Sequence, residues 1–221
     1  MRTHLAGLDL RTGRAVSRHA DEQVTAASII KLPVMVHVLQ AVDADQLSLS
    51  DVGPLVRPMI AVSSNEATNE LLDVVGLAAV QQTCDALGLG ATVVARQMMD
   101  MAARAAGREN LTTAADVLRL LHLLAGGSLL SATTQAFAME CLLAQEFDRL
   151  PVPAGYRFAH KTGELAGVRH DAGILIDADG PAAVVVALLS ELDLGDDDET
   201  PADLFHPAAG VLWGGLTPRS A

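Results

Sequence analysis

The sequence predicts a mixed α/β (α+β) fold, in which an antiparallel sheet built from both chain ends is flanked by helices and carries an inserted all-helical lobe. Strand-like patterns lie near the N-terminus and after residue 155, and helical apolar spacing fills the middle. Half of the 221 residues are apolar, enough for a substantial core. We therefore expect one domain over 1–221, with 1–27 and 151–221 as the sheet lobe and 28–150 as the helical lobe.

The first elements follow from turn and helix signals. Residues 5–10 and 15–19 flank a Gly-containing turn at 11–14, which predicts a hairpin. A long buried helix is expected to begin near Ala27, with Pro33 in its first turn, where proline is tolerated.

The remaining elements follow from periodicity and from breakers. Helices are predicted at 55–62, 66–75, 77–87, 113–124 and 133–147, and a loop with a short helical piece is predicted at 91–110. Strands are predicted at 156–161, 171–176 and 182–189, with a turn at 177–180 and a closing helix at 202–213.

Composition excludes several classes of protein. A net charge of −12 argues against a nucleic-acid partner, and no apolar run is long enough to cross a membrane. No leader precedes the first strand pattern, so the chain as it stands is expected to be cytoplasmic, and exported if it is a trimmed piece. The acidic run at 191–199 predicts a solvated loop, and Cys84 and Cys141 predict buried thiols, with a disulfide left open.

Lysine is rare in this chain. Only Lys31 and Lys161 occur, against thirteen arginines. Lysine differs from arginine in offering a compact amine whose pKa can be lowered. These two positions are therefore candidates for proton chemistry.

Three short motifs surround these lysines. Ser28 precedes Lys31 by three residues on a predicted helix, so that the amine can reach the hydroxyl one turn away and activate it. Ser63 and Asn65 lie at a junction of two predicted helices, and Lys161-Thr162-Gly163 ends a predicted strand. Each motif alone is also typical of an ordinary helix start, helix cap or strand end.

Together, the order Ser-x-x-Lys, Ser-x-Asn, Lys-Thr-Gly is that of class A β-lactamases and penicillin-binding proteins. From about Leu5 to Trp213 the chain resembles the class A β-lactamase-like serine hydrolases. The resemblance implies Ser28 as the acylated nucleophile, Lys31 as its base and Ser63 as the proton shuttle to the leaving group.

The resemblance also implies the substrate contacts. Asn65 would bind a substrate amide, and Lys161 and Thr162 would bind a substrate carboxylate. The oxyanion hole would be the backbone amides of Ser28 and Glu164, the residue after Gly163. No metal or organic cofactor is implied.

One further cation is expected near the site. Arg169, in Arg169-His170-Asp171 on the predicted turn into the next strand, is a candidate second carboxylate contact. His170 and Asp171 are expected to hydrogen-bond locally. His160 alternates to the other strand face and is expected outside the site.

Three departures from the family pattern bear on what the resemblance implies. The chain is short and lacks the family's export signal. Ser63-Ser64-Asn65 replaces the usual Ser-Asp-Asn, which weakens only the class A assignment. No Glu-x-x-Leu-Asn pattern occurs at 96–110, where Asp100 and Glu109 are the only carboxylates that could replace the deacylating glutamate.

The sequence therefore predicts a serine hydrolase that acts through an acyl-enzyme on an amide, lactam or ester bond of a small carboxylate-bearing substrate. Two alternatives stay open. One is an esterase, amidase or D-peptidase with no β-lactam substrate. The other is a binding or sensor domain that penicillin acylates once. The oligomeric state is left open as well.

Overall fold

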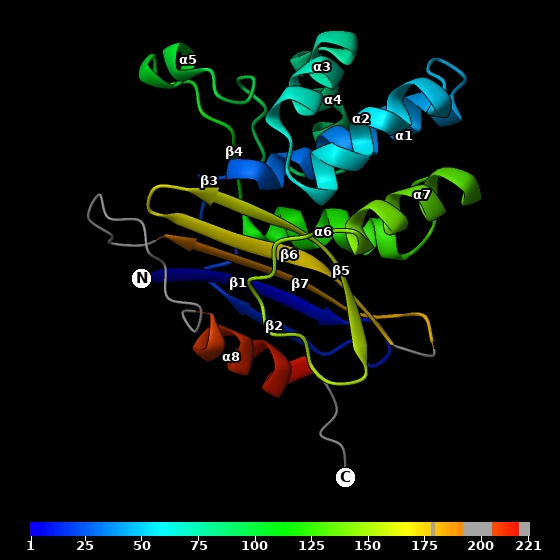
Figure 1. Ribbon diagram of the computed structural model, residues 1–221. Coiled ribbons are helices and arrows are strands. Elements are labelled where there is room, and N and C mark those ends of the chain that lie inside the picture. The colour runs from blue at the N-terminus through cyan, green and yellow to red at the C-terminus, as the bar shows by residue number, and fades with distance from the viewer. Residues whose placement is uncertain (178–179, 192–204, 217–221) are drawn as a thin grey trace.

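The computed structural model describes residues 1–177, 180–191 and 205–216. In this part of the chain, a five-stranded antiparallel sheet has the order β2-β1-β7-β6-β5 (Figure 1). Its strands are β1 (Arg2–Asp9), β2 (Ala15–Arg18), β5 (Tyr156–Leu165), β6 (Val168–Asp177) and β7 (Ala182–Glu191). Because β1 pairs with β7, the two ends of the chain meet in one sheet, and the predicted fold class is confirmed.

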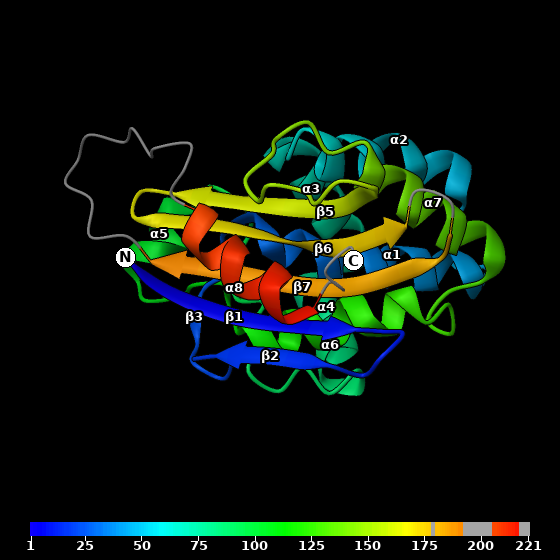
Figure 2. The same ribbon diagram turned by 90° about the horizontal axis from the view of Figure 1, so that it is seen from below.

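Helices cover both faces of this sheet. Alternate side chains of β7 from Val184 to Leu188 belong to the core beneath α8 (His206–Leu216), and those from Val185 to Leu189 belong to the core on the opposite face. Figure 2 shows α8 lying across the sheet. Of the predicted closing helix, residues 202–204 lie outside the described residues, as do 178–179 of the turn and 192–199 of the acidic run.

The helices of the middle segment follow one another along the chain. They are η1 (Ala27–Ile30, a 3₁₀ turn), α1 (Lys31–Asp43), α2 (Leu49–Ala61), α3 (Asn65–Val75), α4 (Leu77–Ala86), α5 (Met101–Ala105), α6 (Ala114–Ala125) and α7 (Ala132–Leu143). A long connection at 87–100 lies between α4 and α5. Although α6 lies in the segment predicted as a separate helical lobe, it packs on the sheet against β1, β6 and β7 (Figure 1).

Two helix boundaries differ from the prediction. The second helix begins at Leu49 instead of residue 55, because Ser48 caps it by accepting a hydrogen bond from the Ser50 amide at 3.2 Å. Pro54 and Pro58 lie inside this helix and hid it in the sequence. Helix α7 ends at Leu143 instead of residue 147.

Strands β5 and β6 are longer than predicted, and this corrects two placements. Lys161-Thr162-Gly163 lies within β5 and not at its end, because pairing continues to Leu165↔Val168. The hairpin closes around Gly167, whose φ of +71° favours glycine. Arg169 to Asp171 therefore lie in β6 and not on a turn.

A small second ladder was missed. Strand β3 (Val24–Thr25) pairs with β4 (Leu111–Thr112). It comes just before the turn at Ala27–Ile30, which carries Ser28 and is called the nucleophile turn after the role predicted for Ser28. Strands of two residues are too short to show a periodicity, so the sequence pattern could not predict them.

The two cysteines are free and buried, as predicted. Burial raises the pKa of the Cys84 thiol to about 12 and that of Cys141 to about 11, so both stay protonated at neutral pH. Among the described residues, no helix has both the length and the apolar character needed to cross a bilayer.

The close pairing of β5 and β6 depends on Gly173. A Cβ at this position would meet the Ala159 carbonyl oxygen and lie 2.5 Å from the His160 Cβ. We expect Gly173→Ala to lower the free energy of unfolding by about 2 kcal/mol in urea denaturation. Gly210→Ala is the control, because Gly210 has open space around it in α8 and should gain about 0.5–1 kcal/mol. Equal stability of the two variants would contradict this view of the strand contact.

Candidate active site

The predicted nucleophile lies on a tightly held turn. Ser28 is partly exposed in η1, and Ala27 before it has a φ of +46°, an uncommon conformation for a residue with a side chain. The Ala26 amide donates to the Asn110 carbonyl at 2.8 Å and fixes the start of the turn. Amides in the first turn of a helix have no partner within the helix, so the Ser28 amide suits an oxyanion donor.

Lys31 follows Ser28 by one turn and is buried. Its Nζ donates to the Ser63 carbonyl at 2.7 Å, to the Ser63 Oγ at 3.1 Å and to the Asn65 Oδ1 at 2.8 Å. Ser63 and Asn65, which the sequence placed at a junction of two helices, therefore both contact the amine of Lys31.

Lys161 approaches the same hydroxyl from the sheet. Its Nζ donates to the Ser63 Oγ at 3.0 Å and to the Thr162 carbonyl at 2.9 Å. Ser63 reaches this position because its backbone takes a φ of +57° between α2 and α3. One hydroxyl therefore lies between two buried amines.

Burial and proximity set the charges of these amines. Burial, together with the charge of Lys161, lowers the pKa of Lys31 to about 7. Burial also lowers the pKa of Lys161 to about 7, but the Asp171 carboxylate opposes this shift. Both amines therefore have a lowered pKa, and the Asp171 carboxylate favours the charged form of Lys161.

Ser64, the departure from the usual aspartate, has a capping role. Its Oγ accepts from the Ala67 amide at 3.1 Å at the start of α3. A serine caps a helix about as well as an aspartate does, so this substitution leaves the geometry of Ser63 and Asn65 intact.

A hollow of about 110 Å³ opens beside the nucleophile. Its lining comes from the nucleophile turn, the start of α3, the end of β5 and the loop at 96–110. The lining residues are Ala27, Ser28, Asn65, Arg96, Met98, Met99, Met101, Arg104, Glu109, Asn110, Glu164 and Leu165. The hollow thus brings Ser28, Asn65 and Glu164 together, as predicted.

The loop at 96–110 is closed by its own polar contacts. The Asn110 Oδ1 accepts from the amides of Ala95 and Arg96 at 2.8 and 3.1 Å, and the Asn110 Nδ2 donates to the Arg96 carbonyl at 3.0 Å. On the opposite side, Asn69 of α3 clamps Met98 with two backbone hydrogen bonds, at 2.8 and 3.0 Å. The backbone of Met98 is therefore fixed at the hollow by the side chain of Asn69.

Neither carboxylate of this loop is placed as a free base. Glu109 pairs with Arg96 at 2.7 Å and with Arg104 at 3.3 Å, and it also accepts from the Asn110 amide. Asp100 is exposed and caps α5 by accepting from the Ala103 amide at 2.8 Å. Both carboxylates hold the loop together.

Arg169 is buried on the sheet face opposite to Lys161. Its guanidinium donates to the Leu165 and Val168 carbonyls at 2.6 and 2.9 Å and pairs with Glu164 at 3.3 Å. These contacts hold the β5–β6 hairpin. They do not favour the predicted carboxylate contact, which stays a prediction. Glu164 also pairs with Arg149 at the rim of the hollow.

Asp171 makes long-range contacts, which corrects the expectation of local ones, whereas His170 makes both a local contact, with the Arg169 carbonyl at 2.8 Å, and a long-range one. The buried Asp171 carboxylate accepts from His160 at 2.7 Å and from the Leu150 amide at 3.0 Å. The His170 imidazole reaches the Thr25 carbonyl at 2.8 Å. His160 stacks on Phe158 and, as predicted, lies outside the site.

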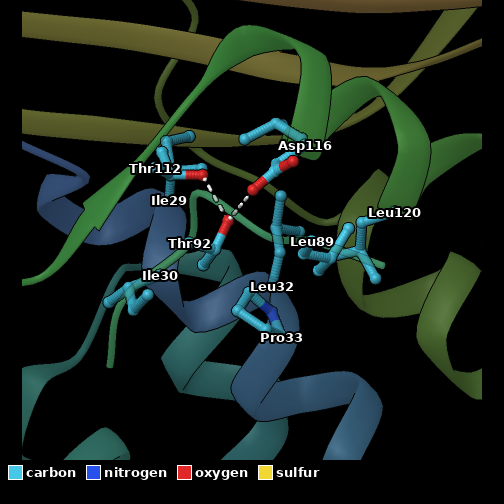
Figure 3. Close-up of a pocket in the computed structure, with 10 residues that line it drawn as sticks. Ile29, Ile30, Leu32, Pro33, Leu89, Thr92, Thr112, Asp116 and Leu120 are labelled. Carbon is cyan, nitrogen blue, oxygen red and sulfur yellow. Dashed lines mark hydrogen bonds between the residues drawn. The ribbon is translucent and has the colours of Figure 1, made fainter. Parts of the chain in front are cut away.

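A second, apolar space lies behind the nucleophile turn (Figure 3). It measures about 10 Å³, which holds at most one water, so it is a packing gap and not a substrate site. Beside it, Thr92 donates to Asp116 at 2.8 Å and contacts Thr112 at 3.0 Å.

Sequence reasoning missed the residues that position the site. Asn69 and Asn110 act through backbone contacts to distant loops, and His170 acts through a carbonyl 145 residues away. A motif of neighbouring residues carries no sign of such contacts. The one feature of the sequence that could have indicated these residues is that each is a polar residue within a largely apolar segment.

Comparison with known proteins places these features in context. A model of the β-lactamase enzyme family matches residues 3–55 and 51–205, which together span most of the chain. Comparison with curated proteins finds no match.

Solved structures share the fold. PBP-A is 23% identical, with 96% of this chain and 89% of that chain covered and a TM-score of 0.85. A β-lactamase from Desulfarculus baarsii is 25% identical, with 98% and 93% covered and a TM-score of 0.83. A β-lactamase from Sphaerobacter thermophilus is 24% identical, with 96% and 89% covered and a TM-score of 0.81.

The two lysines can be titrated directly because the chain has no others. In protein with ¹³C-labelled lysine, we expect the Lys31 signal to titrate near 7, so that the amine is charged below this pH and neutral above it. The unfolded chain titrates near the ordinary 10.5, so this site's contribution to stability rises with pH between the two values.

Removing the second cation tests the cause of this shift. Lys161→Met should raise the pKa of Lys31, whereas Lys161→Arg, which keeps the charge, should leave it near 7. A Lys31 signal that titrates near 10.5 in the parent protein would refute the assignment.

Proposed function

Because the chain belongs to the β-lactamase enzyme family, we propose that it is a serine hydrolase that forms an acyl-enzyme at Ser28 on an amide, lactam or ester bond. The observation that carries this proposal is the Ser63 hydroxyl between the Nζ atoms of Lys31 and Lys161, at 3.1 and 3.0 Å. Such an array stores and moves a proton beside the nucleophile.

In the acylation step, Ser28 attacks the substrate carbonyl while neutral Lys31, one turn away, takes the hydroxyl proton. The oxygen that becomes negative is bound by the backbone amides of Ser28 and Glu164. Each such donor contributes about 10²–10³-fold in rate. Expulsion of the leaving group then requires a proton.

Ser63 supplies that proton. Its hydroxyl gives a proton to the leaving nitrogen or oxygen and regains one from the protonated Lys31, which leaves Lys31 neutral again. Asn65 binds the substrate amide and also accepts from Lys31 at 2.8 Å, which orients the amine between Ser28 and Ser63.

The proposed substrate is a small molecule that carries a carboxylate. Lys161 lies beside Ser63 and next to Thr162 on the edge strand, and the Asp171 carboxylate favours its charged form. A buried cation at a strand edge suits an anionic group. Gly163 keeps this strand close to the nucleophile turn.

We further propose that the acyl-enzyme is cleared slowly. Deacylation needs a base within about 3 Å of the attacking water. The loop beside Ser28 offers Met98, Met99 and Met101 to the hollow, and Glu109 is engaged by two arginines. A PBP-A mutant has been solved as an acyl-enzyme complex with penicillin-G, so an adduct of this fold can persist.

One turnover assay distinguishes the proposed function from its two alternatives. Rapid turnover of a chromogenic β-lactam would indicate a β-lactamase, and turnover of simple esters alone would indicate an esterase, amidase or D-peptidase. Labelling that stops at one equivalent for every substrate would indicate a penicillin-acylated sensor.

We expect Ser28→Ala to abolish covalent labelling by penicillin or by a serine-directed phosphonate, because Ser28 is the serine one turn before Lys31, whose pKa is lowered to about 7. Intact mass after mixing measures this. Ser48→Ala, which removes only the cap of α2, is the control and should label fully. An adduct mass on the Ser28→Ala protein would place the nucleophile elsewhere.

The clamped position of Met98 gives a test of deacylation. In the parent protein the penicillin adduct should persist for minutes or longer, because loss of a general base costs about 10²–10⁴-fold. Met98→Glu brings a carboxylate to the clamped position and should speed decay of the adduct at least about tenfold.

Met101→Glu is the matched control, since it adds the same charge to the same loop at a side chain that is 57% exposed and has no clamp. Asp100→Asn should leave the decay unchanged. Turnover of penicillin at many cycles per second by the parent would sink the idea of slow clearance.

A further inference from the structure

We propose that His170 is a positioning residue that holds the nucleophile turn against the sheet and thereby sets the distance between the two oxyanion donors. The inference rests on the proposed function and goes beyond it to a residue outside the three motifs. His170 is buried in β6, on the face that carries the catalytic helices.

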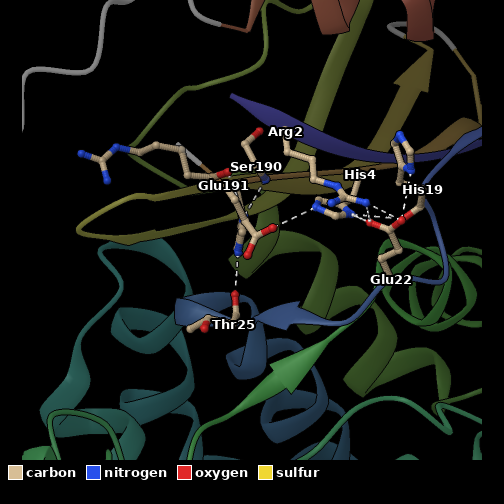
Figure 4. Close-up of polar contacts among 9 residues, drawn as sticks. Arg2, His4, His19, Glu22, Thr25, Ser190 and Glu191 are labelled. Atoms are coloured by element: carbon tan, nitrogen blue, oxygen red, sulfur yellow. Dashed lines mark hydrogen bonds and ion pairs between the residues drawn. The ribbon is translucent and has the colours of Figure 1, made fainter. Parts of the chain in front are cut away.

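The imidazole connects two backbone groups from distant segments. Its Nε2 lies 2.8 Å from the Thr25 carbonyl, and the Ser190 amide donates to its Nδ1 at 3.1 Å. The Nδ1 atom also lies 2.8 Å from the carbonyl of the neighbouring Arg169. Figure 4 labels Thr25 and Ser190. Because a carbonyl only accepts, the contact with Thr25 is a hydrogen bond when Nε2 carries a proton.

The Nδ1 atom lies between a donor and an acceptor, because the Ser190 amide donates to it and the Arg169 carbonyl lies 2.8 Å away. Burial lowers the pKa of His170, and the hydrogen bonds to the Thr25 and Arg169 carbonyls oppose this shift. The positioning role rests on the contact of Nε2 with Thr25.

The two ends of the contact belong to the two halves of the oxyanion hole. Thr25 precedes Ser28 by three residues, and His170 lies directly opposite Gly163, the neighbour of Glu164. A Cβ on Gly163 would lie 3.1 Å from Ile29 and 3.3 Å from His170. The nucleophile turn and the imidazole thus both pack against strand β5 at Gly163. This close approach is possible because Gly163 has no side chain.

Other hydrogen bonds of the turn lead elsewhere. The Ala26 amide is bonded to Asn110, and β3 pairs with β4 beside the loop at 96–110. Among the described residues, the His170 hydrogen bond is the one that fastens the Thr25 carbonyl to the main sheet. A shift of about 1 Å between catalytic groups can cost on the order of 10²-fold in rate.

Two conservative variants separate positioning from folding. In His170→Gln the side-chain amide nitrogen can take the place of Nε2 and reach Thr25. In His170→Asn the shorter side chain can replace only Nδ1. Both keep a polar, uncharged group in the same buried space.

His4 supplies the matched control. It is a buried histidine of the same sheet, and its Nε2 lies 3.3 Å from the Glu191 carboxylate (Figure 4). Asparagine can again replace only Nδ1, so His4→Asn removes an Nε2 contact at the same depth.

The experiment measures the second-order rate of Ser28 acylation by penicillin and by a phosphonate, with thermal unfolding and hydrogen exchange at residues 24–30. We expect His170→Asn to acylate about 10–100-fold more slowly and to exchange faster at 24–30. His170→Gln should stay within about threefold of the parent, and His4→Asn within about twofold, at temperatures where all variants are folded.

Equal acylation rates in the Asn and Gln variants would overturn the proposal, as would an equal loss in His4→Asn. If the parent protein is not labelled by any probe, the proposed function fails instead. The exchange measurement still judges the His170 contact in that case, and unchanged protection in His170→Asn would then overturn it.

Discussion

The site depends on keeping two amines out of water around a single hydroxyl. Burying an ammonium group is costly, and burying two of them within reach of one oxygen adds their repulsion. The protein meets this cost with the Ser63 and Thr162 carbonyls, the Asn65 amide oxygen and the more distant Asp171 carboxylate. The remaining charge is reduced by the lowered pKa of Lys31.

This requirement explains much of the fold. The groups around the hydroxyl come from the start of α1, the junction of α2 with α3, and an edge strand of the sheet. Strand β5 can offer Lys161 to the helices because it is the last strand of its sheet and lies against η1. Helix α6 and the ladder of β3 with β4 close the space behind the nucleophile turn, where only a gap of about 10 Å³ is left.

The sequence was informative wherever a short-range rule applied. The sheet from both chain ends and the loop at 91–110 could be predicted from periodicity and breakers, and the grouping of Ser28, Lys31, Ser63 and Lys161 followed from the resemblance of the three motifs to a known family. The start of α2 was missed because its cap and two prolines gave opposite signals. The extent of β5 and β6 was missed because polar residues continue a ladder whose hydrogen bonds are all between backbone groups. Asn69, Asn110 and His170 act on backbone groups far along the chain, and a single sequence holds no record of such pairs.

The pairing of β1 with β7 has a consequence for how the protein is made. Strand β1 occupies residues 2–9 and its neighbour occupies residues 182–191, so during translation the first strand waits for its partner until most of the chain has left the ribosome. At about 5–20 residues per second this delay is on the order of ten seconds or more. The helices of the middle segment can form in that interval, but strand β5 with Lys161 is synthesised only after them. Strand β2 can pair with one edge of β1 early, but the other edge of β1 stays unpaired until β7 is made, and a chaperone that binds extended apolar segments would find a binding site at that edge.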